Sequence, residues 1–286
     1  MGSLISIGSS YGIQSAPARG RSNMTLRLAL TLATTSLFAQ SCNAQAPGPE
    51  VGATIEATAL ALGTIRGIGR RMDSINTLQF SGSGTANVPM ADGEWMSYEI
   101  SEATVGLSYS IPARRLDMTR TGSDGVEERV VHVVRGDRAW DERLPGVDPS
   151  DAAAGAVSER LAHIILTPHG FITAVVQNPD AVSTGIDGGQ TTLTVEIDGS
   201  AVTATLDENS RPATVEMTVD HPTLGQTQLE ADYSEYVDWP ILDVYFPSRI
   251  VHRLGGETTL DMTVTDFYQN PYVVFPTPEQ LSGSSQ

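Results

Sequence analysis

The sequence contains no lysine and only one cysteine, Cys42. All 17 basic side chains are therefore arginines, which excludes Schiff-base lysines and the lysine of a phosphate-binding loop. A single cysteine forms no internal disulfide, and Cys42 lies in a segment that we expect to be removed or modified, so thiol catalysis is excluded as well. Acidic residues number 34, and the net charge of −17 repels phosphate backbones. We therefore expect no nucleic-acid partner.

Long apolar runs are also absent, since no stretch approaches the length of a membrane-spanning helix. We therefore do not expect an integral membrane protein. Residues Leu26 to Ala39 form a shorter apolar run behind arginines, which is typical of a secretory signal. Small residues at Ala44 and Ala46 predict cleavage after Ala46, with lipidation at Cys42 as the alternative. The sequence thus predicts a periplasmic or secreted protein, with residues 1–46 as an upstream extension and signal peptide.

Two stretches of the remaining chain have helical periodicity. Ile55, Ala59 and Leu62 recur at helical spacing and predict a helix up to about Met72. A helical insert over 151–178 contains Thr167 and Pro168, the pattern of an N-cap followed by proline at the first helical position. The expected boundaries are 47–52 for a linker, 53–276 for a single β-rich domain and 277–286 for a polar tail.

Elsewhere apolar residues recur at every second position, which predicts β-strands. Asp198-Gly199 lies between two such stretches and suits a two-residue turn with positive φ angles. Strands joined in order by tight turns pair antiparallel. Gly82-Ser83-Gly84 indicates a bulge or bend where the sheet curls. The predicted fold class is α+β, mainly β: a curved antiparallel sheet, or half-barrel, that encloses the helical insert and an N-terminal helix.

Five residue strings occur in a recognisable order between Ala57 and Pro276. They are Leu78-Gln79-Phe80-Ser81-Gly82-Ser83-Gly84, Arg138-Ala139-Trp140, Leu166-Thr167-Pro168-His169-Gly170-Phe171, Phe246-Pro247-Ser248-Arg249-Ile250-Val251 and Thr259-Leu260-Asp261-Met262-Thr263-Val264-Thr265-Asp266. Together they resemble the N-terminal, non-catalytic region of exported bacterial metallo-β-lactamase-fold hydrolases. That resemblance implies a downstream zinc domain with a His-x-His-x-Asp-His cluster, which does not follow Pro276 here.

The order of helix, strands, helical insert and strands is also similar to that of periplasmic lipoprotein carriers of the LolA/LolB type. In those proteins a half-barrel closed by helices accommodates acyl chains. This second resemblance is one of architecture, so it implies a function only by analogy.

Motifs for catalysis or metal binding are not found. No two of the five histidines have the i, i+2 or i, i+4 spacing that places two imidazoles on one metal ion. Gly82-Ser83-Gly84 lacks the spacing of a Gly-x-Ser-x-Gly nucleophile motif and lies in a predicted strand. The sequence therefore predicts no metal, no cofactor and no catalytic residue, and it favours a protein that is not an enzyme. A hydrolase that uses scattered His and Asp side chains is the alternative.

The remaining candidate site is apolar. We expect six residues on facing elements to line a ligand-binding gap, with core packing as their alternative role: Trp140, Ile164, His169, Phe171, Val175 and Tyr233. The predicted function is an exported, non-catalytic binding domain that holds an apolar small molecule or lipid between sheet and helices. The alternative is an accessory N-terminal module of a metallo-β-lactamase-fold zinc hydrolase, which would then be its partner.

Overall fold

The structure is a computed structural model that describes residues 49–64, 75–152, 155–239, 243–273 and 275–278, all within the unit Ala44–Gln286. The expected signal peptide and Cys42 lie outside the described residues. The helices are α1 (Pro49–Ala61), α2 (Ala156–Ile165), α3 (Pro168–Gln177) and the 3-10 turn η1 (Pro179–Ala181). The strands are β1 (Thr77–Pro89), β2 (Trp95–Ser108), β3 (Ala113–Gly122), β4 (Glu127–Arg135), β5 (Arg138–Glu142), β6 (Ser150–Asp151), β7 (Val182–Asp187), β8 (Gln190–Ile197), β9 (Ser200–Leu206), β10 (Pro212–His221), β11 (Gly225–Trp239), β12 (Val244–Leu254) and β13 (Glu257–Gln269).

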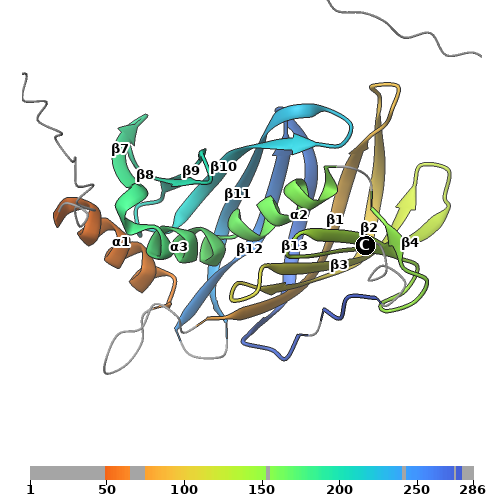
Figure 1. Cartoon of the computed structure of the whole chain (residues 1–286), viewed down its shortest axis with the longest axis horizontal. Helices are drawn as coiled ribbons and strands as arrows, with labels where there is room; N and C mark the ends of the chain where they lie inside the picture. Colours follow the sequence, from red (N-terminus) through yellow and green to blue (C-terminus); the bar gives the residue numbers. More distant parts are fainter. Residues whose placement is uncertain (1–48, 65–74, 153–154, 240–242, 274, 279–286) are drawn as a thin grey trace, which may run out of the picture. The chain divides into compact units, whose positions relative to one another are not determined.

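All 13 strands form one antiparallel sheet in the order β6-β5-β4-β3-β2-β1-β13-β12-β11-β10-β9-β8-β7. The sheet consists of two meanders, β1 to β6 and β7 to β13, which join where β1 pairs with β13. The helical segment leaves β6 at one edge of the sheet and leads into β7 at the other edge. Helices α2 and α3 therefore run across one face of the sheet, as Figure 1 shows.

The predicted α+β half-barrel is wrong. The structure is mainly β, with 59% strand against 16% helix, and its sheet is not closed into a barrel. The reason lies in the connectivity: the helical segment joins the two edge strands, β6 and β7, so it spans an open sheet from edge to edge. Short helices placed in this way cover part of one face, and the strands dominate the fold.

The turn and the bulge predicted from glycine are confirmed. Asp198 and Gly199 have φ angles of 50° and 80° and connect β8 to β9. In β1 the register shifts at Ser81/Gly82 against β13 and at Gly82/Gly84 against β2. A Cβ at Gly84 would lie 1.9 Å from the carbonyl oxygen of Asp261, so the neighbouring strand approaches too closely for any side chain there. The bulge thus bends the sheet at its centre.

The predicted start of α3 is also confirmed. Thr167 is its N-cap and accepts a hydrogen bond from the Gly170 amide at 3.1 Å, and Pro168 follows at the first helical position. Helix α1 begins at Pro49, within the stretch expected as a linker, and ends at Ala61. The part of the predicted helix from 65 to 72 lies outside the described residues. No helix among the described residues is long and apolar enough to cross a membrane.

Strands β4 and β5 of the first meander are covered on both faces. On one face, β1 to β5 contribute to the main core beside the helices. On the other face, Val131, Val133 and Trp140 form a separate cluster with Phe275, near the end of the described chain. The Arg135 guanidinium donates a 2.8 Å hydrogen bond to the Phe275 carbonyl oxygen and so fastens this segment to the sheet. Two covered faces explain why residues 130–134 are apolar on both sides of β4, apart from His132.

Candidate functional site

A cavity lies between α2 and the middle of the sheet. Helix α2 contacts β10 in one meander and β3, β4 and β5 in the other. Residues of α2 and of the strands near the centre of the sheet line a cavity of about 290 Å³, which we call the α2 pocket. Its size lies at the lower end of the range for small-molecule sites.

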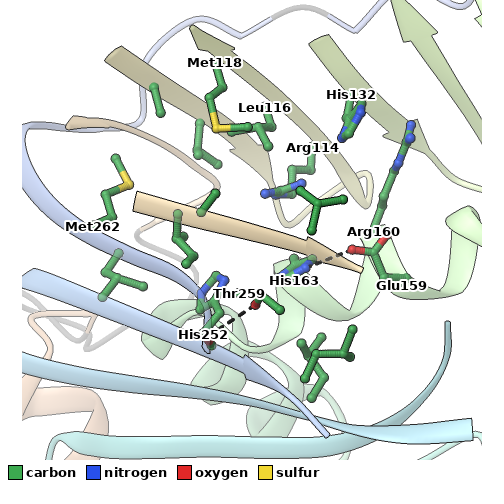
Figure 2. Close-up of a pocket in the computed structure, with 18 of the residues that line it drawn as sticks. Arg114, Leu116, Met118, His132, Glu159, Arg160, His163, His252, Thr259 and Met262 are labelled. Carbon is green, nitrogen blue, oxygen red and sulfur yellow. Dashed lines mark hydrogen bonds and ion pairs between the residues drawn. The ribbon is translucent and has the colours of Figure 1, made fainter. Parts of the chain in front are cut away.

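Most of the wall is apolar and comes from the sheet. Its apolar residues on β1, β2, β3, β11, β12 and β13 are Phe80, Ala86, Val88, Pro89, Ala103, Val105, Leu116, Met118, Leu229, Ile250, Leu254, Leu260 and Met262. Figure 2 shows two methionines of this wall, Met118 and Met262, on the same side of the pocket. Methionine side chains adapt to ligands of irregular shape. This part of the pocket suits a hydrocarbon chain.

The opposite part of the pocket is polar, and the residues come from strands and helix alike. Four of the five histidines of the sequence line it. The polar and charged residues on this side are Arg114, His132, Asp141, Glu159, Arg160, His163, His221 and His252. In Figure 2, Glu159 and Arg160 lie on the side away from the methionines, with Arg114 between the two groups. The α2 pocket is therefore amphiphilic.

Arg160 holds α2 to the first meander. Its guanidinium donates to the carbonyl oxygens of Val133 at 3.0 Å and Trp140 at 2.8 Å, and it pairs with the Asp141 carboxylate at 2.6 Å. The side chain is almost completely buried. Because its donors are engaged by three acceptors from β4 and β5, the main role of Arg160 is to position the helix.

Glu159 and His163 form a second polar pair one helical turn apart on α2. The Nε2 atom of His163 lies 3.1 Å from the Glu159 carboxylate. Burial by itself raises the pKa of Glu159, but the hydrogen bond and the charges of His163, Arg114 and Arg160 outweigh it and lower the pKa to about 2. Glu159 is therefore ionised throughout the physiological range. His163 also stacks on His252 of β12, with 5.0 Å between ring centroids.

The other pocket histidines are uncharged at neutral pH. Burial lowers the pKa of His132 to about 4, and the positive charge of Arg160 acts in the same direction. Burial also lowers the pKa of His252, well below its ordinary value, and that of His221. Desolvation disfavours the imidazolium form in each case. Among the described groups, the charges on the pocket wall at neutral pH are thus carried mainly by arginines and carboxylates.

The hydroxyl groups of the described lining are already used in structural hydrogen bonds. Thr167 donates to the Ile164 carbonyl oxygen at 2.8 Å, Thr259 donates to that of His252 at 3.3 Å, and Tyr233 donates to that of Leu166 at 2.8 Å. A nucleophilic hydroxyl needs a base as its partner instead. Within the part of the chain that the structure describes, no three His, Cys, Asp or Glu side chains are grouped to hold a metal ion.

Of the six residues predicted to line a ligand gap, only Tyr233 lines the α2 pocket. Ile164, Phe171 and Val175 are buried in the main core. His169 is also buried, lies 3.2 Å from the Leu62 carbonyl oxygen and stacks on Phe246. Trp140 belongs to the separate cluster on the other face of the sheet, because side chains alternate along β5 and its neighbour Asp141 takes the pocket face.

Arg114 and the four pocket histidines are site residues that were not predicted from the sequence. These histidines come from β4, α2, β10 and β12, so no local spacing links them. One signal was available: His132 is the polar interruption in the apolar run 130–134. Because buried polar groups are hydrogen-bonded, a polar side chain in such a run indicates polar groups or water next to it.

No protein-family model matches the chain, and no curated protein matches it. The resemblance to regions of metallo-β-lactamase-fold hydrolases therefore finds no support. A solved structure of a LolA superfamily protein from Nitrosomonas europaea is similar over 81% of this chain and 96% of that chain, at 12% identity and a TM-score of 0.37. A likeness at that level carries no argument about function.

Proposed function

We propose that this protein binds an apolar or lipid-like ligand in the α2 pocket and catalyses no reaction on it. The observation that carries the proposal is the cavity of about 290 Å³ between α2 and the central strands, lined largely by apolar side chains. Transfer of a hydrocarbon chain from water into such a cavity gains about 0.8 kcal/mol for each methylene group. The polar side of the pocket then orients the ligand.

The proposal includes export to the periplasm or the medium. Its support is the apolar segment Leu26 to Ala39 followed by small residues up to Ala46. N-terminal sequencing of the protein recovered from cells tests it. A mature chain that starts at Pro47 supports the proposal, and a chain that keeps the whole segment contradicts it. A lipid-modified N-terminal Cys42 supports export by the alternative route.

Native mass spectrometry of protein purified from cells tests ligand binding directly. We expect an added mass that disappears after extraction with organic solvent, and a fluorescent apolar probe that binds the extracted protein. Protein that carries no added mass and binds no probe after extraction contradicts the proposal.

Two matched substitutions locate the binding. Ala103 lies on β2 in the pocket wall, whereas Ser101 on the same strand is exposed. Ala103→Phe places a ring inside the pocket, and Ser101→Phe places the same ring in solvent. We expect probe binding to be lost in the first variant and kept in the second. Equal binding by both variants, with folding verified by circular dichroism, would show that the probe binds elsewhere.

A further inference from the structure

Arg114 differs from the other arginines that the structure describes. It lies on β3, retains 8% of its accessible area and lines the α2 pocket. No described residue forms a hydrogen bond or an ion pair with its guanidinium. Arg160, which is equally buried, has acceptors on β4 and β5. The exposed arginines Arg129 and Arg249 also have carboxylate partners, although water already solvates their charges.

An unpaired buried guanidinium is unusual in this chain in particular. The sequence has 34 acidic residues against 17 arginines, so carboxylates are available for pairing. Burial lowers the pKa of Arg114 to about 10, and the group stays charged at neutral pH. The guanidinium lines the pocket, away from bulk water, and a charge in such a place without a protein partner is costly. A ligand that supplies acceptor oxygens at this point would lower that cost.

We propose that Arg114 is a headgroup subsite, and that the ligand of the α2 pocket is an amphiphile with one anionic head, a carboxylate or a phosphate. This inference rests on the proposed function and adds the chemical class of the ligand. The planar guanidinium binds both kinds of head through two parallel hydrogen bonds. The rest of the ligand is a hydrocarbon chain.

The order of the lining residues along β3 indicates how the ligand is oriented in the pocket. Arg114, Leu116 and Met118 alternate along β3 and all line the pocket. At a rise of about 3.3 Å per residue, Met118 lies roughly 13 Å from Arg114 along the strand. A head at Arg114 thus places the chain of the ligand over Leu116 and Met118, against the wall that includes Met262.

Other charged residues also line the α2 pocket, and we compare their hydrogen-bond partners with those of Arg114. On α2, Glu159 accepts from His163, and on β5, Asp141 accepts from Arg160. Both carboxylates therefore already have donors, whereas the donors of Arg114 have no acceptor among the described residues. His132 and His252 are uncharged at neutral pH, so neither attracts nor repels an anionic head. Glu159 still repels an anion, so its neutralisation should strengthen binding.

The test compares three ligands with the same chain on the purified, delipidated protein: dodecanoate, dodecyl phosphate and 1-dodecanol. Isothermal titration at pH 8 keeps both acids ionised. We expect one or both anions to bind more tightly than the alcohol. Arg114→Gln should weaken anion binding by about tenfold to a hundredfold and leave the alcohol unchanged, because hydrogen bonds to charged groups are lost. The anion that loses more identifies the carboxylate or the phosphate as the natural head.

Two further variants support the interpretation. Glu159→Gln should bind the anions more tightly than the wild type, which is opposite in direction to Arg114→Gln. Arg129→Gln, which removes an exposed arginine paired with Asp117, should have no effect. Unchanged alcohol binding by Arg114→Gln also shows that this variant is folded; if it is not, Glu159→Gln alone decides by the direction of its effect.

The outcomes separate this inference from the proposed function. If the alcohol and the anions bind equally, or an Arg114→Gln variant that circular dichroism shows to be folded weakens all three ligands alike, the headgroup subsite is refuted and the apolar binding function stands. If Glu159→Gln leaves anion binding unchanged or weaker, the subsite is refuted as well. If none of the three ligands binds, the proposed apolar binding function itself is refuted.

Discussion

Two tyrosines attach the junction of α2 and α3 to the sheet through hydrogen bonds. The substitution Tyr233→Phe tests how much this attachment contributes to the free energy of unfolding. Tyr233 of β11 donates a 2.8 Å hydrogen bond to the Leu166 carbonyl oxygen. Tyr109, just after β2, lies 2.9 Å from the Thr167 hydroxyl, on the side of the other meander. The junction is thus held from both halves of the sheet. Because α2 forms one wall of the pocket, this anchor positions the site.

The two bonds differ in what their loss leaves behind. Without the Tyr233 hydroxyl, a buried carbonyl oxygen loses the side-chain donor that the structure gives it, at a cost of about 1–3 kcal/mol. Without the Tyr109 hydroxyl, Thr167 still donates to Ile164 and accepts from Gly170, so the cost is only about 0.5–1.5 kcal/mol. Tyr233→Phe should therefore be the more destabilising of the two.

Urea unfolding at pH 7, followed by tryptophan fluorescence, checks this order. Burial raises the pKa of both phenols above the ordinary value of 10, so both act as donors at that pH. Tyr268 on β13 is 47% exposed, and Tyr268→Phe serves as the control, with an expected change within about 0.5 kcal/mol. The reasoning is refuted if Tyr109→Phe costs as much as Tyr233→Phe, or if both match the control.

Two further predictions concern pH and the central bulge. Burial and the charge of Arg160 lower the pKa of His132 from 6.5 to about 4, so the unfolded chain binds a proton in that interval that the folded chain does not. Unfolding free energy should fall as the pH drops from 6.5 to about 4, and His132→Gln should make this fall shallower in urea titrations; an equal slope in both proteins would contradict it. Gly84→Ala should cost about 1–3 kcal/mol, because its Cβ would lie 1.9 Å from the Asp261 carbonyl oxygen. Gly52→Ala in α1, with nothing within 4 Å, should instead gain about 0.5–1 kcal/mol, and thermal unfolding that gives both variants the same sign would contradict the geometry.

The α2 pocket unites side chains that are distant in the sequence. Arg114, His132, His163 and His252 come from β3, β4, α2 and β12. Their meeting depends on the pairing of β1 with β13 and on the crossing of α2 over the sheet. Neither can be read from local periodicity, because periodicity reports which face a residue occupies within its own element and not which elements are neighbours.

The sequence by itself determined features that depend on only a few consecutive residues. The positive φ angles at Asp198-Gly199, the Thr167 N-cap with Pro168 and the bulge at Gly82 to Gly84 are all set by local backbone chemistry. Only the tertiary structure decided the open sheet and the site. It placed Trp140 on the face away from the pocket, and it left Arg114 without a described partner beside a hydrocarbon-lined cavity. The physical reason is that burial and charge pairing depend on which distant strands become neighbours, and that is settled by packing of the whole sheet.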